Sequence, residues 1–342
     1  MNSKLTFKSL AIAGFIAASF AANAGTTVAQ DSTAPLSIMG NVCSYYRYSA
    51  NNAPSLTSYT KAINSVGLGM ANLMVSKDNG KVGFMIDLIF GPRAEETNYN
   101  YTGTQVALKQ AYVTYKPSSK LTLTAGSFLT FFSYELVESC NNLNYSMSYT
   151  FTNGPFYHTG IKAEYAISDK WSVLLGVFNR TDFKLDTTSK KYVGGQLAYV
   201  DGPFKMYLKA LSGNEPDKST VTTLDATINY QATPKFNLGF DITNKSIAPE
   251  KGSMASFLGA SLYANYAVSD AFLFAFRGEY FDDSKGVAAI GDKITAFTLS
   301  GNYKVEAFTL IPEIRFDSAA DGTLFNGKKS DTSFLLAAVY KF

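Results

Sequence analysis

The chain ends in SFLLAAVYKF (residues 333–342), where large apolar side chains recur at every second position. One parity holds Phe334, Leu336, Ala338, Tyr340 and Phe342, and the other includes Ser333 and Lys341. Successive side chains of a β-strand point to opposite faces, so this stretch predicts a strand with one apolar face. The strand ends on an aromatic residue.

The same kind of stretch, about ten residues long, repeats from residue 36 onward. Tight turns follow every second stretch, at 77–80, 117–120, 168–170, 201–203, 233–235, 269–270 and 305–307, and most of them carry the Gly, Pro, Asn, Asp or Ser that turns require. Longer connections fall near 50–63, 92–104, 132–155, 182–190, 213–220, 247–255, 282–292 and 318–330. Seven short turns and eight long connections predict sixteen strands, with all the short turns at one end.

This alternation favours an all-β fold, a transmembrane antiparallel up-and-down β-barrel over residues 36–342. An even number of strands closes such a sheet without edges, as a lipid environment demands. A soluble β-sandwich would also alternate, with its apolar parity facing a core. The polar parity here is largely uncharged and rich in Gly, and aromatic residues gather at strand ends, which favours the barrel.

The N-terminus predicts export. Lys4 and Lys8 precede an apolar run at 10–22, and Ala22-Asn23-Ala24 has the small-x-small pattern of a signal peptide over residues 1–24. An alternative cleavage site follows Ala29. Removing residues 1–24 lowers the formal net charge from +3 to +1. A nearly neutral mature chain argues against nucleic acid as a partner.

A series of short motifs lies between residues 125 and 160. They are Ala125-Gly126-Ser127-Phe128, Tyr134-Glu135, Asn144-Tyr145-Ser146-Met147-Ser148 and Gly154-Pro155-Phe156-Tyr157-His158-Thr159-Gly160. This series resembles the OmpL-like β-barrel porin family, and the closing strand resembles that of bacterial outer-membrane barrels. Many relatives carry a basic residue where this chain has Met147.

The resemblance implies a porin of the Gram-negative outer membrane, a water-filled channel for passive diffusion of small hydrophilic solutes. The implied partners are outer-membrane lipid, lipopolysaccharide and the barrel-assembly machinery, for which Phe342 would be the signal. Porins of this size are often homotrimers. Two alternatives stay open. One is a structural, adhesion or receptor barrel. The other is a substrate-selective channel, for sugars for example, which Tyr45 and Tyr207 on the polar parity suggest.

The longest connection, 132–155, is rich in apolar and aromatic residues that would be unfavourable in water. We expect it to fold inward as the third external loop, with an outer cap or a protomer contact as the alternative. Glu135 and Glu138 would then form the pore constriction opposite the arginines of the wall. The basic residues expected at the pore are Arg47, Arg277, Arg315, Arg180 and Lys162, and the expected anchors of the loop are His158 and Tyr145.

Charges on the lumen parity balance at seven basic against seven acidic residues, which predicts weak ion selectivity. These charges could instead pair with one another as salt bridges. One His and two Cys cannot supply a typical zinc site, and no nucleophile motif is present, so we expect no enzyme, no cofactor and no metal. Cys43 and Cys140 could form one disulfide in an oxidising periplasm.

Overall fold

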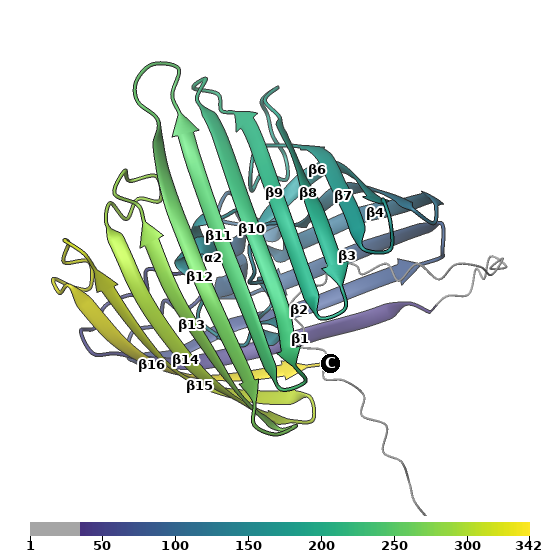
Figure 1. The fold of residues 1–342 in the computed structure, drawn as a ribbon. Helices are drawn as coiled ribbons and strands as arrows, with labels where there is room; N and C mark the ends of the chain where they lie inside the picture. The colour runs from purple at the N-terminus through teal and green to yellow at the C-terminus, as the bar shows by residue number, and fades with distance from the viewer. Residues whose placement is uncertain (1–34) are drawn as a thin grey trace, which may run out of the picture.

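The described residues, 35–342 of the computed structural model, form one closed antiparallel sheet of sixteen strands. The strands are β1 (Ser37–Ser49), β2 (Ser65–Asp78), β3 (Val82–Phe90), β4 (Leu108–Ser118), β5 (Leu121–Leu129), β6 (Tyr157–Ala166), β7 (Trp171–Phe178), β8 (Tyr192–Asp201), β9 (Phe204–Asn214), β10 (Thr220–Thr233), β11 (Phe236–Ala248), β12 (Ala255–Ala267), β13 (Phe272–Asp282), β14 (Lys293–Val305), β15 (Phe308–Ala319) and β16 (Ser330–Lys341). Each strand pairs with its neighbours in sequence, and β1 pairs with β16 (Figure 1). The predicted sixteen-stranded barrel is confirmed. The predicted signal peptide and its alternative cleavage site lie outside the described residues.

Short helices interrupt two of the connections, the one between β3 and β4 and the one between β5 and β6. They are α1 (Pro92–Thr97), η1 (Gly103–Ala107), η2 (Ser139–Asn141) and α2 (Tyr149–Asn153). Within residues 35–342, no helix has the length and apolar character needed to cross a membrane.

Connections of two lengths alternate around the barrel, as the sequence predicts. Seven turns of two to four residues join the strands at one end. The eight connections at the other end are longer, and the longest is 130–156 between β5 and β6. Antiparallel pairing places all seven turns on one side of the membrane and the eight loops on the other.

The two faces of the sheet are opposite in character. Apolar side chains such as Val66 and Ile161 point outward and are 75% and 63% exposed. Polar side chains on the other parity, such as Asp225, Asp241 and Arg277, point inward and are buried. A sandwich would bury its apolar parity, so this arrangement is that of a barrel whose outer face meets lipid.

Aromatic side chains form a ring on the outer face beside the short turns. Its members are all at least 37% exposed and include Tyr115, Tyr165, Trp171, Tyr230, Tyr266, Tyr303 and Tyr340. Amphipathic aromatic rings favour the interface between hydrocarbon and headgroups, so this girdle marks one edge of the membrane.

The closing strand seals the barrel through its last residue. Nine residue pairs join β1 to β16, and Phe342 then exchanges two backbone hydrogen bonds with Gly40, each 3.0 Å long. A Cβ atom at Gly40 would lie 2.3 Å from the carbonyl oxygen of Asn72 and 2.6 Å from the Phe342 ring. The seam therefore requires glycine at position 40.

Gly40→Ala should destabilise this seam. The added methyl group meets backbone on one side and the terminal ring on the other, and overpacking of this kind costs about 1–3 kcal/mol. The temperature at which the folded barrel loses its compact mobility on an SDS gel should fall. Gly278→Ala is the matched control, since a Cβ there makes ordinary contacts at 3.5 Å or more. Equal unfolding temperatures for the two variants would contradict this account of the seam.

Candidate functional site: the barrel interior

Residues 130–156, called loop 3 below, contact the inner wall on the far side of the barrel from their own strands. Ser133 Oγ donates to Asp241 on β11 at 3.2 Å, and Glu135 pairs with Arg277 on β13 at 2.6 Å. The backbone N–H of Tyr145 donates to a carboxylate on β15. Since β13 lies eight strands from β5 in a ring of sixteen, the loop crosses the interior.

Alternating charges on β13 and β15 form a ladder against loop 3. Arg277 Nε lies 2.8 Å from Glu279, and Glu279 in turn lies 3.3 Å from Arg315. Arg315 also pairs with Asp317 at 2.9 Å. Arg277 is 0% exposed. Because buried charges are stable only when paired and hydrogen-bonded, Glu135 completes the ladder as the loop's contribution.

Two acids of the wall, Glu279 of this ladder and Glu313, accept hydrogen bonds from the backbone of the loop. Glu313 accepts the N–H of Tyr145 at 2.8 Å and that of Ser146 at 3.2 Å. Glu279 accepts the N–H of Tyr149 at 2.8 Å. An irregular loop inside a barrel exposes many backbone donors, and each buried donor needs a partner.

The arginines satisfy backbone acceptors of the same segment. Arg277 donates to the carbonyl oxygen of Ser146 at 2.6 Å, and Arg315 donates to that of Met147 at 2.9 Å. Met147 itself is buried. Backbone donors and backbone acceptors of the loop therefore both form hydrogen bonds with charged side chains of the wall.

A second cluster holds the start of loop 3 against β9–β11. Lys209 pairs with Asp225 at 2.7 Å and donates to the carbonyl oxygen of Ser133 at 3.2 Å. One ring of the loop, that of Tyr134, stacks on Tyr263 of β12 with ring centroids 4.1 Å apart. The loop is therefore fixed at both ends of its path across the barrel.

Lys109 is a site residue that the sequence pattern does not predict. It is fully buried and contacts both Asp87, at 2.8 Å, and Glu138 of loop 3. Simple alternation would point Lys109 outward, because Gln110 faces the lumen. A β-bulge between β3 and β4 adds Lys109 as an extra residue in the pairing and turns its side chain inward.

Arg93 also has a role that its position in a loop did not suggest. It lies in α1, fully buried, and donates to the carbonyl oxygen of Val137 at 2.7 Å. Its guanidinium lies 4.3 Å from the ring centroid of Tyr59 and 5.2 Å from that of Tyr145. Cation–π contacts on both rings thus connect α1 to loop 3.

The charged residues predicted for the constriction lie in direct contact with partners. The sequence interpretation placed Glu135 and Glu138 across an open channel from Arg47, Arg277 and Arg315. Instead, Glu135 touches Arg277, Glu138 touches Lys109, and Arg47 lies 3.7 Å from an aspartate on β16. The lumen charges therefore form ion pairs with one another, which was the alternative interpretation of the sequence. They do not form two charged surfaces that face each other across the channel.

The two remaining basic residues of the prediction also have acidic partners. Arg180 lies outside the strands and pairs with Asp186 and Glu215, each at 3.2 Å. Lys162 points into the lumen from β6 and lies 3.3 Å from Glu164. Of the two, Lys162 borders open space.

Of the two residues predicted to anchor loop 3, His158 contacts the start of the loop, and Tyr145 connects the middle of the loop to the wall. The Nε2 atom of His158 lies 3.0 Å from Thr130 Oγ1, where the loop begins. Tyr145 donates its backbone N–H to the wall and its hydroxyl to the Cys43 sulfur at 3.3 Å. Both Cys43 and Cys140 are free thiols, so the structure contains no disulfide between them. Cys43 faces Tyr145 on the wall, whereas Cys140 lies in η2 beside Asn141.

Asp182 joins three external connections at the outer end of the barrel. Its carboxylate accepts the N–H groups of Phe156 and Tyr157, at 2.8 and 3.0 Å, and the hydroxyl of Tyr99 at 3.0 Å. Burial raises the pKa of Asp182 to about 6, although these hydrogen bonds act in the opposite direction. The end of loop 3 is thus tied to the loops on either side.

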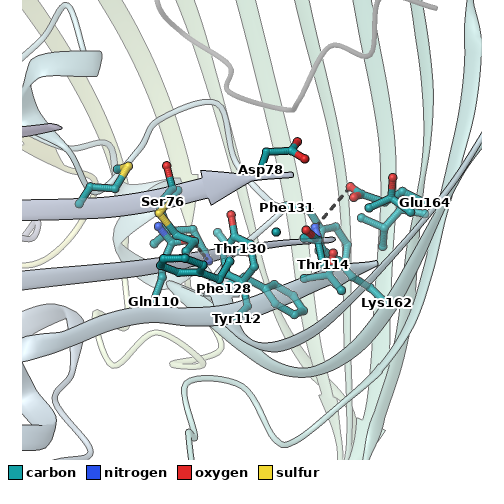
Figure 2. Close-up of a pocket in the computed structure, with 18 of the residues that line it drawn as sticks. Ser76, Asp78, Gln110, Tyr112, Thr114, Phe128, Thr130, Phe131, Lys162 and Glu164 are labelled. Carbon is teal, nitrogen blue, oxygen red and sulfur yellow. Dashed lines mark hydrogen bonds and ion pairs between the residues drawn. The ribbon is translucent and has the colours of Figure 1, made fainter. Parts of the chain in front are cut away.

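A cavity of about 410 Å³ remains on the wall opposite the charge ladder. Its lining comes from β2–β8 and from the first half of loop 3, and it extends to Asp78 and Lys116 beside the short turns. Figure 2 shows Tyr112, Phe131 and the Lys162–Glu164 pair around it. This cavity therefore lies on one side of the lumen, while loop 3 contacts strands from β9 to β15 on the other side.

The closed sixteen-strand barrel with an apolar outer face, an aromatic girdle and a polar interior is the architecture of a porin. The family described as "Putative beta-barrel porin-2, OmpL-like" matches residues 35–342. The chain belongs to this OmpL-like porin family and is a channel-forming barrel of the Gram-negative outer membrane. The resemblance identified from the sequence is confirmed.

Solved structures agree with this fold at low sequence identity. The anion-selective porin from Comamonas acidovorans has a TM-score of 0.64 at 13% identity, covering 90% of this chain and 100% of that chain. OmpF of Salmonella typhi, solved with daunomycin, has a TM-score of 0.63 at 12% identity, covering 90% of this chain and 98% of that chain. The trimer form of OmpT from Vibrio cholerae has a TM-score of 0.61 at 12% identity, covering 90% of this chain and 99% of that chain. A search of curated proteins found no match.

Removing the Arg277 side chain should release loop 3. Arg277→Gln leaves Glu135 and Glu279 buried without their shared cation, and breaking a buried pair costs about 3–5 kcal/mol. We expect single-channel conductance to rise and the heat resistance of the barrel to fall. Arg180→Gln is the control, since it disrupts a less buried pair outside the strands and should cost about 1 kcal/mol or less. Unchanged conductance in Arg277→Gln would refute the anchoring role of the ladder.

Proposed function

We propose that this porin conducts small hydrophilic solutes by passive diffusion along the β2–β8 side of the barrel, with weak ion selectivity and no catalytic role. The observation that carries the proposal is the cavity beneath loop 3, which reaches the short-turn side. A barrel of sixteen strands is wide enough for an aqueous path beside the loop.

The charges around this path support weak selectivity. The lining includes Lys77, Lys116 and Lys162 on the basic side and Asp78, Glu138 and Glu164 on the acidic side. Lys116 contacts Asp78, and Lys162 contacts Glu164. A filter for one sign of ion needs an uncompensated ring of charge, and the lining has three charges of each sign.

Loop 3 sets the width of the path in this proposal. Its residues Phe131, Phe132 and Leu136 face the cavity, while its acids Glu135 and Glu138 bind to basic residues of the wall. The constriction would therefore be shaped by the aromatic start of the loop, with the acids holding it in position.

A trimeric assembly, in contact with outer-membrane lipid and lipopolysaccharide, is part of the proposal. The solved relative from Vibrio cholerae includes a trimer form, and the outer face here is apolar on all sides of the barrel. In a trimer, three channels would insert together into a membrane.

Planar bilayer recording tests this function. Purified protein should produce discrete conductance steps, grouped in threes, with a reversal potential close to zero in a potassium chloride gradient. Protein unfolded by heating before reconstitution is the control and should give no steps. A reversal potential near the Nernst value of either ion would refute weak selectivity, and a complete lack of steps would refute the channel.

A further inference from the structure

We propose that the cavity on the β2–β8 wall binds uncharged saccharides of one or two rings as they pass through this porin. The inference rests on the proposed channel and adds a class of solute to it. The volume, about 410 Å³, lies within the range of about 300–1,000 Å³ typical of small-molecule sites.

Aromatic rings from three segments border this cavity. Tyr112 comes from β4, Phe128 from β5 and Phe131 from loop 3, and all three line the same space (Figure 2). The C–H faces of a sugar ring are apolar and stack on aromatic faces, which remove them from water. Such rings favour a saccharide over a simple ion.

The rings are held in fixed positions by their neighbours. Phe131 contacts Phe178 and His158, with ring centroids 5.8 and 5.0 Å apart. Tyr112 and Phe128 meet edge to face at 6.3 Å. A ligand that stacks on this surface therefore finds it already ordered, which lowers the entropic cost of binding.

Polar side chains on the same wall offer hydrogen bonds to hydroxyl groups. The lining includes Thr114, Thr122, Thr124 and Gln196, whose side chains carry hydroxyl and amide groups. These groups both donate and accept, as the hydroxyls of a sugar do. A site of aromatic faces with a few polar groups is the usual composition of a small-molecule pocket.

The ion pair of Lys162 and Glu164 on this wall is internally neutral. Lys162 lies 3.3 Å from Glu164, and its ammonium also lies 4.8 Å from the Phe128 ring centroid. The charge of Lys162 is thereby compensated on two sides, which leaves no strong attraction for a charged solute. An uncharged polyol fits this environment best.

Current block by maltose tests the inference. In planar bilayers, maltose added to the short-turn side of the parent channel should reduce the potassium chloride current with saturation. Tyr112→Ala and Phe131→Ala should each raise the half-saturating maltose concentration about three- to tenfold, since each removes one aromatic contact. Phe131 lies in loop 3, outside the sheet, so its removal leaves strand pairing intact.

Tyr165→Ala is the matched control. Tyr165 lies on β6 with Lys162 but points outward and is 44% exposed, so its loss should not change the block. Conductance steps in the parent without saturable block would overturn the saccharide site and leave the channel intact. Block that is equally strong in Tyr112→Ala and Phe131→Ala would also overturn the site. Absence of any steps would overturn the channel itself.

Discussion

The requirement that every backbone N–H and C=O group find a partner governs this molecule twice. In lipid it forces the sheet to close, and the last two bonds of that closure join Phe342 to Gly40. Inside the barrel, the same requirement applies to a long irregular loop. There the partners are charged side chains on β13 and β15 rather than other strands.

The need to satisfy the backbone of loop 3 explains why so many charged side chains are buried in the wall. Glu313 and Glu279 accept N–H groups of loop 3, while Arg277 and Arg315 donate to its carbonyls. Hydrogen bonds to charged groups are stronger than those between neutral groups, and paired charges tolerate burial. The ladder thus fixes the loop to one side of the barrel. The open space on the other side follows from that attachment.

The architecture was predictable from the sequence because it depends on local patterns. Strand parity, turn residues and the lengths of connections indicate sixteen strands. Gly126, a residue of the family motif, has a φ of 134°, a backbone conformation that favours glycine at the point where β5 meets β4. The partners of the lumen charges were not predictable, because they depend on where loop 3 lies. Lys109 was missed since a bulge reverses its parity, and Glu135 was placed across a channel from Arg277 although the two are in contact.

The central claim is that the aqueous path follows the β2–β8 wall and avoids the wall covered by loop 3. It is tested most directly by thiol modification of single cysteines, in a background with Cys43 and Cys140 replaced by serine. A bulky methanethiosulfonate reagent should reduce the current through Thr114→Cys, which borders the cavity. The same reagent should leave the current through Thr298→Cys unchanged, because Thr298 is buried beside Arg277 under the loop. Reduction of the current at Thr298→Cys and not at Thr114→Cys would contradict the account.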